Sequence, residues 1–531
     1  MSQPFEIFEY HIDKLSEILA EKSKASLKDI NKKLHSHYFE NYFDGIGART
    51  IIVENDYIDR DFLDDYAEYY VKCFKRYRRK CTRLHFFRTS LSSEDLDALL
   101  SLGPDDLSAS KFQKAYLGFI VVIPLPRTVI GRTCLTAYPS DSGRRNFPIL
   151  RPYQANLFGL SLQINSLAFQ EQDMVVAACA TSALWSVFHG TGMLFQHSIP
   201  SPVEITKAAT DNFPIEDRAI PSHGLNYAQM AYVIRSVGLE PMLVDARDHY
   251  ILKSILYAYL KGSIPLIMGI NLYDVTGKRG RFMGKHAVAI TGYSLGLSKA
   301  KPFSNTGFLL RASRIDKIYV HDDQVGPFAR MKFDGKKVVF DQEKETKEAS
   351  SISTSWRGDN GNGPIGSARA VAECVLVPIY HKIRITFETV HDSVLFFDLF
   401  FEQLRKKGFL PSLAQRIEWE IYFTTINELK KDLLNSKILK GLYRKNALTE
   451  SMPRFIWRAT AYTKDSPVLD LLFDATDIEQ GNFFLRAIEY DPLIAMILRI
   501  VAKEEAVVEN FEESPAGRIL EWFKEQPIES F

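Results

Sequence analysis

The stretch that decides the fold is residues 172–185, QDMVVAACATSALW. A short polar lead-in precedes Cys179, and an apolar run at helical spacing follows it, which predicts a buried helix that begins at the cysteine. This helix is expected to span residues 179–189 and to stop at Gly190-Thr191-Gly192, because glycine is frequent just beyond a helix end. The pattern therefore places one thiol at the N-terminus of a core helix.

Two polar residues downstream lie at the edges of predicted strands. His286 is expected to open a strand over residues 286–293, and Asp322 is expected to close a later strand that could pair beside it. Cysteine, histidine and carboxylate in this order suggest a nucleophile, a base and a group that orients the base. Asp323 remains open as the alternative to Asp322.

A cysteine at this position has physical reasons to act as a nucleophile. A thiol attacks as the thiolate, which the unpaired amides of a helix N-terminus and a neighbouring imidazolium both favour. The oxyanion that forms needs donors already in place. The amide of Cys179 and a side-chain amide upstream would supply them; Gln172 is the preferred candidate and Gln170 the other.

Length and composition set the broad class. A chain of 531 residues has room for two to four domains, and a formal net charge of +1 gives no global attraction to nucleic acid. The five cysteines are scattered and odd in number, so we expect no disulfide framework. The N-terminus has no secretory pattern, and the most apolar segment, residues 116–124, is too short to span a membrane. We therefore expect a cytoplasmic protein that binds neither membrane nor nucleic acid.

The chain is predicted to contain three regions. Residues 1–149 form an N-terminal α/β region of unknown role, and residues 150–384 form one catalytic unit. Residues 385–531 form a C-terminal α+β region, with a long helix expected over residues 417–435. Helices come first in the catalytic unit and antiparallel strands follow, so the fold class is predicted to be α+β.

Two other groups of residues are candidates for a metal site and for a nucleic-acid-binding site, and neither site is expected. Cys73, Cys81 and His85, with His35 and His37 upstream, could supply metal ligands, but their spacing matches no common zinc site. The basic run at residues 75–80 is expected to be the solvated end of a helix. We expect no metal and no cofactor.

Four features in chain order resemble the papain-like cysteine peptidases, most closely the bacteriocin-processing (double-glycine leader) peptidase-like branch. They are Gln172, Cys179, Gly284-Lys285-His286-Ala287-Val288 and Asp322-Asp323-Gln324-Val325-Gly326-Pro327. The resemblance covers about residues 150–384 and implies a helix-borne cysteine packed on an antiparallel sheet. It also implies Cys179 as nucleophile, His286 as base, Asp322 as orienter and Gln172 as oxyanion donor. The interval from Gln172 to Cys179 is one position longer than is usual in that family.

The function predicted from these residues is that of a bacterial cysteine peptidase that hydrolyses peptide bonds of a protein or peptide through a Cys179 thioester. The flanking regions would select the substrate or bind a regulatory partner. Two alternatives stay open. One is a transglutaminase-like or deamidating acyl transferase that uses the same triad, and the other is a non-catalytic binding or scaffold protein that retains the fold.

Overall fold

The computed structural model describes residues 4–102, 106–173, 175, 177–211, 224–342, 345–410, 416–464, 466–478, 482–504 and 514–528. Helices and mainly antiparallel strands occur in comparable amounts, so the protein has the mixed helix-and-sheet class that was predicted. Within these ranges, no helix combines the length and apolar character needed to cross a bilayer.

The chain divides into two compact units. The first comprises Met1–Arg247, Ile264–Ser294 and Asp316–Pro378, and the second comprises Asp248–Ser263, Leu295–Ile315 and Ile379–Phe531. Residues 1–149 thus belong to the same unit as Cys179, whereas residues 385–531 belong to the other. The roles assigned to the three predicted regions stay predictions.

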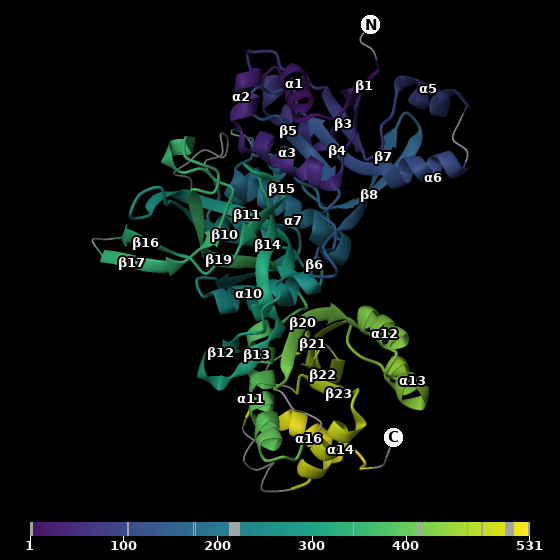
Figure 1. Cartoon of the computed structure of the whole chain (residues 1–531), viewed down its shortest axis with the longest axis vertical. Helices are drawn as coiled ribbons and strands as arrows, with labels where there is room; N and C mark the ends of the chain where they lie inside the picture. The colour runs from purple at the N-terminus through teal and green to yellow at the C-terminus, as the bar shows by residue number, and fades with distance from the viewer. Residues whose placement is uncertain are drawn as a thin grey trace. The chain divides into compact units, whose positions relative to one another are not determined.

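A five-stranded antiparallel sheet occupies the N-terminal part of the first unit (Figure 1). Its strands in spatial order are β1 (Phe5–Glu9), β2 (Thr50–Tyr57), β3 (Cys81–Phe87), β4 (Tyr116–Val122) and β5 (Ile130–Leu135). The helices between these strands are α1 (Ile12–Ser23), α2 (Leu27–Lys32), α3 (Leu34–Ile46), α4 (Arg60–Glu68), α5 (Ser93–Leu102) and α6 (Asp106–Ala115). Strands β3 and β4 are buried along their whole length, because their sequences are rich in the aromatic and β-branched residues that favour packed strands.

The rest of the first unit is built on a ring of six strands. Strand β10 pairs with β11 on one side and with β19 on the other, and β14, β15 and β18 complete the ring. Their bounds are β10 (Leu266–Asp274), β11 (Arg281–Leu295), β14 (Ile315–Asp322), β15 (Gly326–Lys332), β18 (Ile352–Ser353) and β19 (Ala368–Tyr380). Strand β9 (Leu239–Asp245) pairs with β19, and β6 (Arg145–Asn146) pairs with β11. Two separate hairpins are β7 (Arg151–Leu157) with β8 (Leu160–Ser166), and β16 (Lys337–Gln342) with β17 (Glu345–Ser350).

Helix α7 (Cys179–Phe195) packs against β10 and is buried from Ala180 to Thr191. It begins at the cysteine, as predicted, but the predicted stop at Gly190 is wrong. A Cβ atom at Gly190 would lie 2.9 Å from Cγ of Pro265, so the missing side chain lets the helix lie close to its neighbour. The helix ends where Gln196 adopts a left-handed conformation with φ of 60°. The two shorter helices that follow are α8 (Pro202–Thr210) and α9 (Tyr227–Ser236).

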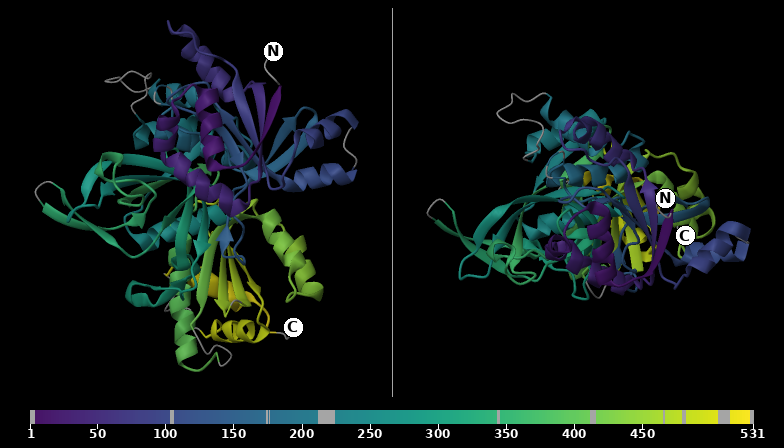
Figure 2. Two further views of the ribbon diagram at one scale, coloured as in Figure 1. Left: turned by 45° about the horizontal axis from the view of Figure 1, so that its top comes forward. Right: turned by 90° about the horizontal axis from the view of Figure 1, so that it is seen from above.

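The second unit contains a six-stranded sheet with helices beside it (Figure 2). Its strands in spatial order are β12 (Pro302–Phe303), β13 (Phe308–Leu310), β20 (Glu418–Thr425), β21 (Phe455–Thr463), β22 (Ser466–Asp474) and β23 (Phe484–Glu489). The helices are α10 (His249–Lys261), α11 (Phe387–Lys406), α12 (Ile426–Asn435), α13 (Gly441–Thr449), α14 (Pro492–Val501) and α16 (Gly517–Glu525). The single helix predicted over residues 417–435 is wrong, because its first half is the central strand β20. The sequence EWEIYFTT carries the aromatic and β-branched residues that favour strands.

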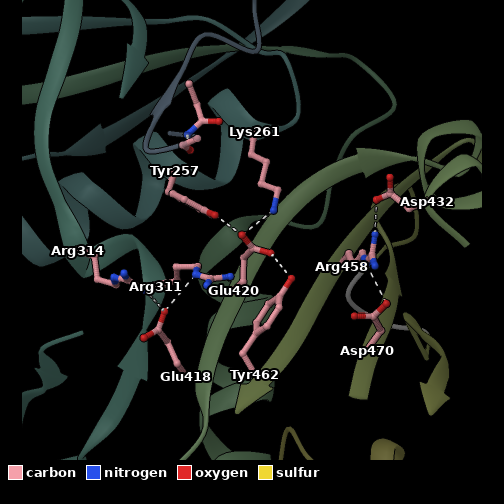
Figure 3. A network of polar contacts seen from close by, with 12 residues as sticks. Tyr257, Lys261, Arg311, Arg314, Glu418, Glu420, Asp432, Arg458, Tyr462 and Asp470 are labelled. Atoms are coloured by element: carbon pink, nitrogen blue, oxygen red, sulfur yellow. Dashed lines mark hydrogen bonds and ion pairs between the residues drawn. The ribbon is translucent and has the colours of Figure 1, made fainter. Parts of the chain in front are cut away.

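A network of charges, with Glu420, Arg458 and Asp470 buried and the others more exposed, crosses this second sheet (Figure 3). Glu420 on β20 accepts hydrogen bonds from Tyr257, from Lys261 at 2.5 Å and from Tyr462 at 3.2 Å. Farther along the sheet, Arg458 donates to Asp470 at 2.9 Å and to Asp432 at 2.8 Å. With Arg311 and Arg314 against Glu418, the network drawn in Figure 3 holds four cations and four carboxylates. Its charges balance in number, and its buried members are each paired with an opposite charge.

Candidate active site

Cys179 occupies the first position of helix α7 and is half-buried. The preceding residue, Ala178, is extended and offers no side-chain cap, and the first helical hydrogen bond runs from the Ser182 amide to the Ala178 carbonyl. The amides of the first turn therefore point out of the helix end without an intrahelical acceptor. This end of the helix can stabilise a thiolate or a developing oxyanion beside the cysteine.

The other cysteines lie in different surroundings. All five are free thiols, but Cys81, Cys134 and Cys374 are buried, and burial raises the pKa of each of these three. Cys73 is half-buried like Cys179, yet it lies outside any helix N-terminus and hydrogen-bonds the carbonyl of Tyr69. Cys179 is thus distinguished by its neighbours rather than by exposure alone.

His286 lies on β11, opposite Ile270 of β10. The strand begins at Arg281, five residues before the predicted start at His286, so this predicted boundary is wrong. A register shift falls just before the histidine, where Leu272 pairs with Gly284 and the next residue, Tyr273, pairs with Phe282. Gly284 has φ of 154°, a conformation that side-chain-bearing residues rarely adopt, so glycine suits this bulge. Bulges of this kind often set the direction of side chains beside a functional site.

Asp322 closes β14, and the strand order places it beside β11. Its Oδ1 accepts hydrogen bonds from His286 Nε2 at 3.2 Å and from the Gln324 amide at 3.1 Å. Its Oδ2 accepts one from the indole Nε1 of Trp356 at 2.8 Å. Both carboxylate oxygens are therefore occupied, and the imidazole is oriented by a carboxylate that is itself held in place.

Trp356 is a member of the site that sequence reasoning did not find. Besides its hydrogen bond to Asp322, its ring lies edge-on to the His286 ring, with centroids 5.0 Å apart. It lies between β18 and β19 in a polar, glycine-rich segment, where the pattern predicted only a loop. A single tryptophan in such a segment was the one available signal.

Asp323, the alternative candidate for the orienting role, also lies close to His286. Its Oδ1 lies 3.5 Å from His286 Nε2 but makes no hydrogen bond with the described residues, and its Oδ2 accepts one from the Gln324 side chain at 3.0 Å. Asp322 therefore holds the better geometry for the orienting role. Asp323 adds a second buried negative charge beside the same ring nitrogen.

The electrostatics of these buried groups favour the protonated form of the imidazole. Burial lowers the pKa of His286, but the charges of Asp322 and Asp323, with hydrogen bonds to Asp322 and to Cys179, outweigh it and hold the pKa well above its ordinary value. Burial would raise the pKa of Asp322, but His286, Trp356 and the Gln324 amide lower it overall. Burial raises the pKa of Asp323 to about 6 despite the attraction of His286, and repulsion from Asp322 adds to the rise.

The Cys179 thiol is near enough to the His286 ring to contribute to the raised pKa of the imidazole. Because Nε2 already faces Asp322 and Asp323, Nδ1 is the ring nitrogen that remains for the sulfur. A charged imidazolium with a carboxylate on one nitrogen and a thiol on the other can stabilise a thiolate and later return a proton. Cys179, His286 and Asp322 are thus brought together from three separate elements of the first unit.

The two glutamines proposed for the oxyanion lie in the segment before α7, and their role stays a prediction. Gln172 is half-buried in the segment before α7, and its backbone carbonyl accepts a weak hydrogen bond from Thr128 at 3.4 Å. Gln170 is buried in the same segment. Neither side chain hydrogen-bonds Cys179 or His286 within the described part of the chain. The amide of Cys179 is the oxyanion donor that the backbone itself supplies.

His286, Asp322 and Asp323 also have donor atoms within 4.8 Å of one another, a spacing that a metal ion could use. The donors of His286 and Asp322 are engaged, however, because Nε2 bonds Asp322 and Oδ2 of that carboxylate bonds Trp356. An ion would have to displace these hydrogen bonds and would meet a raised imidazole pKa, which opposes ligation. Among the described residues, Cys73, Cys81, His85, His35 and His37 form no such group.

The N-terminal region contributes to the surroundings of the site. Helix α3 packs against β15, which follows the turn that carries Asp322 and Asp323. The hydroxyl of Tyr38 donates to the Pro327 carbonyl, and buried His35 lies edge-on to Phe169, with ring centroids 6.3 Å apart. Sequence reasoning gave residues 1–149 no chemical role, because helix patterns do not reveal which distant turn a helix will support.

Compared with known proteins, the sequence matches no protein-family model and no curated protein.

Proposed function

We propose that this protein is a cysteine peptidase of papain-like type, with Cys179 as nucleophile, His286 as general base and acid, and Asp322 as orienter. One observation carries the proposal. A buried histidine, held by a carboxylate that is itself hydrogen-bonded on both oxygens, lies near the thiol at the N-terminus of a core helix. Surroundings that shift the pKa of a base strongly beside a nucleophile are typical of catalytic sites.

The proposed reaction has two stages. The Cys179 thiolate attacks the carbonyl carbon of a peptide bond, while the amide at the helix N-terminus stabilises the oxyanion. The imidazolium of His286 protonates the leaving nitrogen, the C–N bond breaks and a thioester remains. Neutral His286 then takes a proton from water, whose oxygen attacks the thioester, and the C–S bond breaks to release a carboxylic acid and restore the pair.

The architecture supports a papain-like arrangement. The nucleophile begins a helix that packs on β10, while the base and the orienter lie on β11 and β14 of the same ring of strands. Their chain order is cysteine, histidine, aspartate, as in the resemblance quoted above. The free state of all five thiols suits a reducing compartment, and we propose that the protein acts in the cytoplasm of a bacterium.

The test is covalent labelling with an iodoacetamide probe at neutral pH, read by peptide mass spectrometry. Cys179 should label fastest, the Cys179→Ala protein should lose that signal, and His286→Ala should slow labelling by roughly a hundredfold or more. Cys73→Ala is the matched control, because Cys73 is the other half-buried thiol. Equal labelling rates at Cys73 and Cys179 would show that the thiol is not activated and would favour a non-catalytic scaffold.

The reaction class is read from products. Proteins incubated with the wild type, but not with Cys179→Ala, should acquire new N- and C-termini. A mass gain of about one unit without new termini would mean deamidation, and isopeptide links would mean transfer to an amine acceptor. Either of these results would replace the peptidase by an acyl transferase that uses the same three residues.

A further inference from the structure

A pocket of about 460 Å³ opens beside the proposed active site in the first unit. Its lining includes Lys32, Arg281, Phe282, Met283, Trp356 and Arg357. Trp356 joins the pocket to the catalytic residues, because the same indole contacts the His286 ring and donates to Asp322. The pocket therefore lies one side chain away from the imidazole.

The charge of this pocket is of one sign. Lys32, Arg281 and Arg357 contribute three cations, and no aspartate or glutamate of the described residues lines it. Arg281 is held by Asp274 at 3.0 Å. Lys32 and Arg357, in contrast, form no ion pair within the described ranges, and Nε of Arg357 is buried there without a hydrogen-bond acceptor. Two cations without ion pairs, one of which has a buried N–H without an acceptor, favour an anionic occupant.

Trp356 links the pocket to the imidazole that would protonate the leaving group. A general acid has to come within hydrogen-bond reach of the nitrogen that it protonates. In the proposed reaction that acid is His286, so the peptide segment that carries the leaving nitrogen runs past His286 and the Trp356 ring. Residues on the C-terminal side of the cleaved bond are the ones that would reach the pocket.

We infer that the pocket binds an acidic side chain or the terminal carboxylate of the substrate, on the C-terminal side of the cleaved bond. This inference rests on the proposed function and names its substrate class. Arg357 would bind the carboxylate, and Lys32 would add a second charge from α2 of the N-terminal region. Phe282 and Met283, placed by the bulge in β11, would contact the methylene groups of the side chain.

The first experiment measures binding without catalysis. An alanine-rich decapeptide with two glutamates and a fluorescent label is titrated against the Cys179→Ala protein by anisotropy, and the same peptide with two lysines or two glutamines serves for comparison. We expect the glutamate peptide to bind most tightly. Arg357→Gln should weaken its binding by about three- to tenfold, and Lys32→Gln by a smaller factor.

The matched control is Lys28→Gln, which removes an exposed lysine from the same short helix α2 outside the pocket. It should leave binding of the glutamate peptide unchanged. The double change Lys32→Glu with Arg357→Glu should reverse the order, so that the lysine peptide binds more tightly. Circular dichroism of each variant checks that the fold is retained.

The second experiment sequences the new termini that the wild type produces in a proteome-derived peptide library. Acidic residues should be enriched in the first positions after the cut, and Arg357→Gln should remove that enrichment while cleavage continues. Cleavage without enrichment, or equal binding of all three decapeptides, would overturn the pocket assignment and leave the peptidase standing. Binding of the glutamate peptide that depends on Arg357, without any cleavage, would instead overturn the peptidase and retain the pocket.

Discussion

Buried charge is arranged differently in the two units. Glu420 in the second unit accepts hydrogen bonds on both carboxylate oxygens, from Tyr257, Lys261 and Tyr462, within a network of four cations and four carboxylates. In the first unit, two buried carboxylates face one imidazole, and Oδ1 of Asp323 accepts no hydrogen bond from the described residues. A balanced network stabilises the folded chain. An excess of negative charge around a base instead raises the pKa of that base, and acid–base catalysis depends on such a shift.

The largest effect should come from removing the orienting charge. Asp322→Asn keeps the size of the side chain but removes the charge that holds the imidazolium, so peptide hydrolysis should fall by roughly a thousandfold or more. The measurement is kcat/KM on a cleaved peptide. Asp316→Asn, on the same strand and away from His286, is the control and should change the rate less than twofold. A similar loss in both variants would mean that β14 is merely disturbed.

The next largest effect concerns the stability of the second unit, where the charges around Glu420 are paired. Burial would raise the pKa of Glu420, but Lys261, Tyr257 and Arg311 lower it to about 2, so the carboxylate is charged in the folded protein. Glu420→Gln leaves Lys261 without its counter-charge and should lower the free energy of unfolding of the second unit by roughly 2–4 kcal/mol. Urea unfolding followed by tryptophan fluorescence measures the loss.

Glu418→Gln is the matched control for this change, since Glu418 lies on the same strand but is more exposed. It should cost about 1 kcal/mol or less. The contribution of Glu420 should be complete above the ordinary glutamate pKa and should disappear as the pH falls towards 2, because the depressed pKa belongs to the folded state. An equal loss in both variants, or a loss for Glu420→Gln that persists in strong acid, would contradict the ionic explanation.

A smaller effect separates the two aspartates of the site. Asp323 raises the pKa of His286, so Asp323→Asn should lower that pKa and move the alkaline limb of the activity profile by about one pH unit towards acid. The maximal rate should change little, because Asp322 still orients the ring. The profile should also lose the inflection expected near the Asp323 pKa of about 6. A large fall in maximal rate with no shift of the limb would make Asp323 the orienter instead.

The last prediction is that removing metal ions does not change the activity. Because His286, Asp322 and Trp356 already satisfy one another, treatment with EDTA followed by gel filtration should leave peptide hydrolysis within experimental error. Added zinc should inhibit by binding the thiolate. Loss of activity on chelation, with recovery on adding a metal, would show that His286, Asp322 and Asp323 hold an ion in the active protein.

Much of the framework is readable from local pattern. The start of α7 was predicted from a polar-to-apolar change at Cys179, and β3 and β4 carry the aromatic and β-branched runs that are typical of strands. Errors arose where a local signal has two meanings. Glycine at position 190 signals a helix end but serves close packing against Pro265, and residues 417–435 fit a helix period although the first half is a strand.

Some residues of the candidate site could be predicted from the sequence, and others could not. Cys179 and Asp322 could be chosen from sequence because each lies at an edge of an element, and His286 could be chosen although it lies inside β11 rather than at its start. Trp356, Lys32 and Arg357 could not, because their place depends on which segments the ring of strands brings together over hundreds of residues. Periodicity carries no information about such distances.

The division of the chain has a consequence for its synthesis. The chain passes between the two units at 247/248, 263/264, 294/295, 315/316 and 378/379, so neither unit is one continuous segment. Helix α10 buries most of its residues and contacts β20, which leaves the ribosome roughly 160 residues later. At bacterial or eukaryotic translation rates, that interval is roughly 10–30 seconds. During that time the apolar side of α10 has no partner strand, so nascent chains stalled before residue 425 should be the forms that chaperones bind and proteases remove.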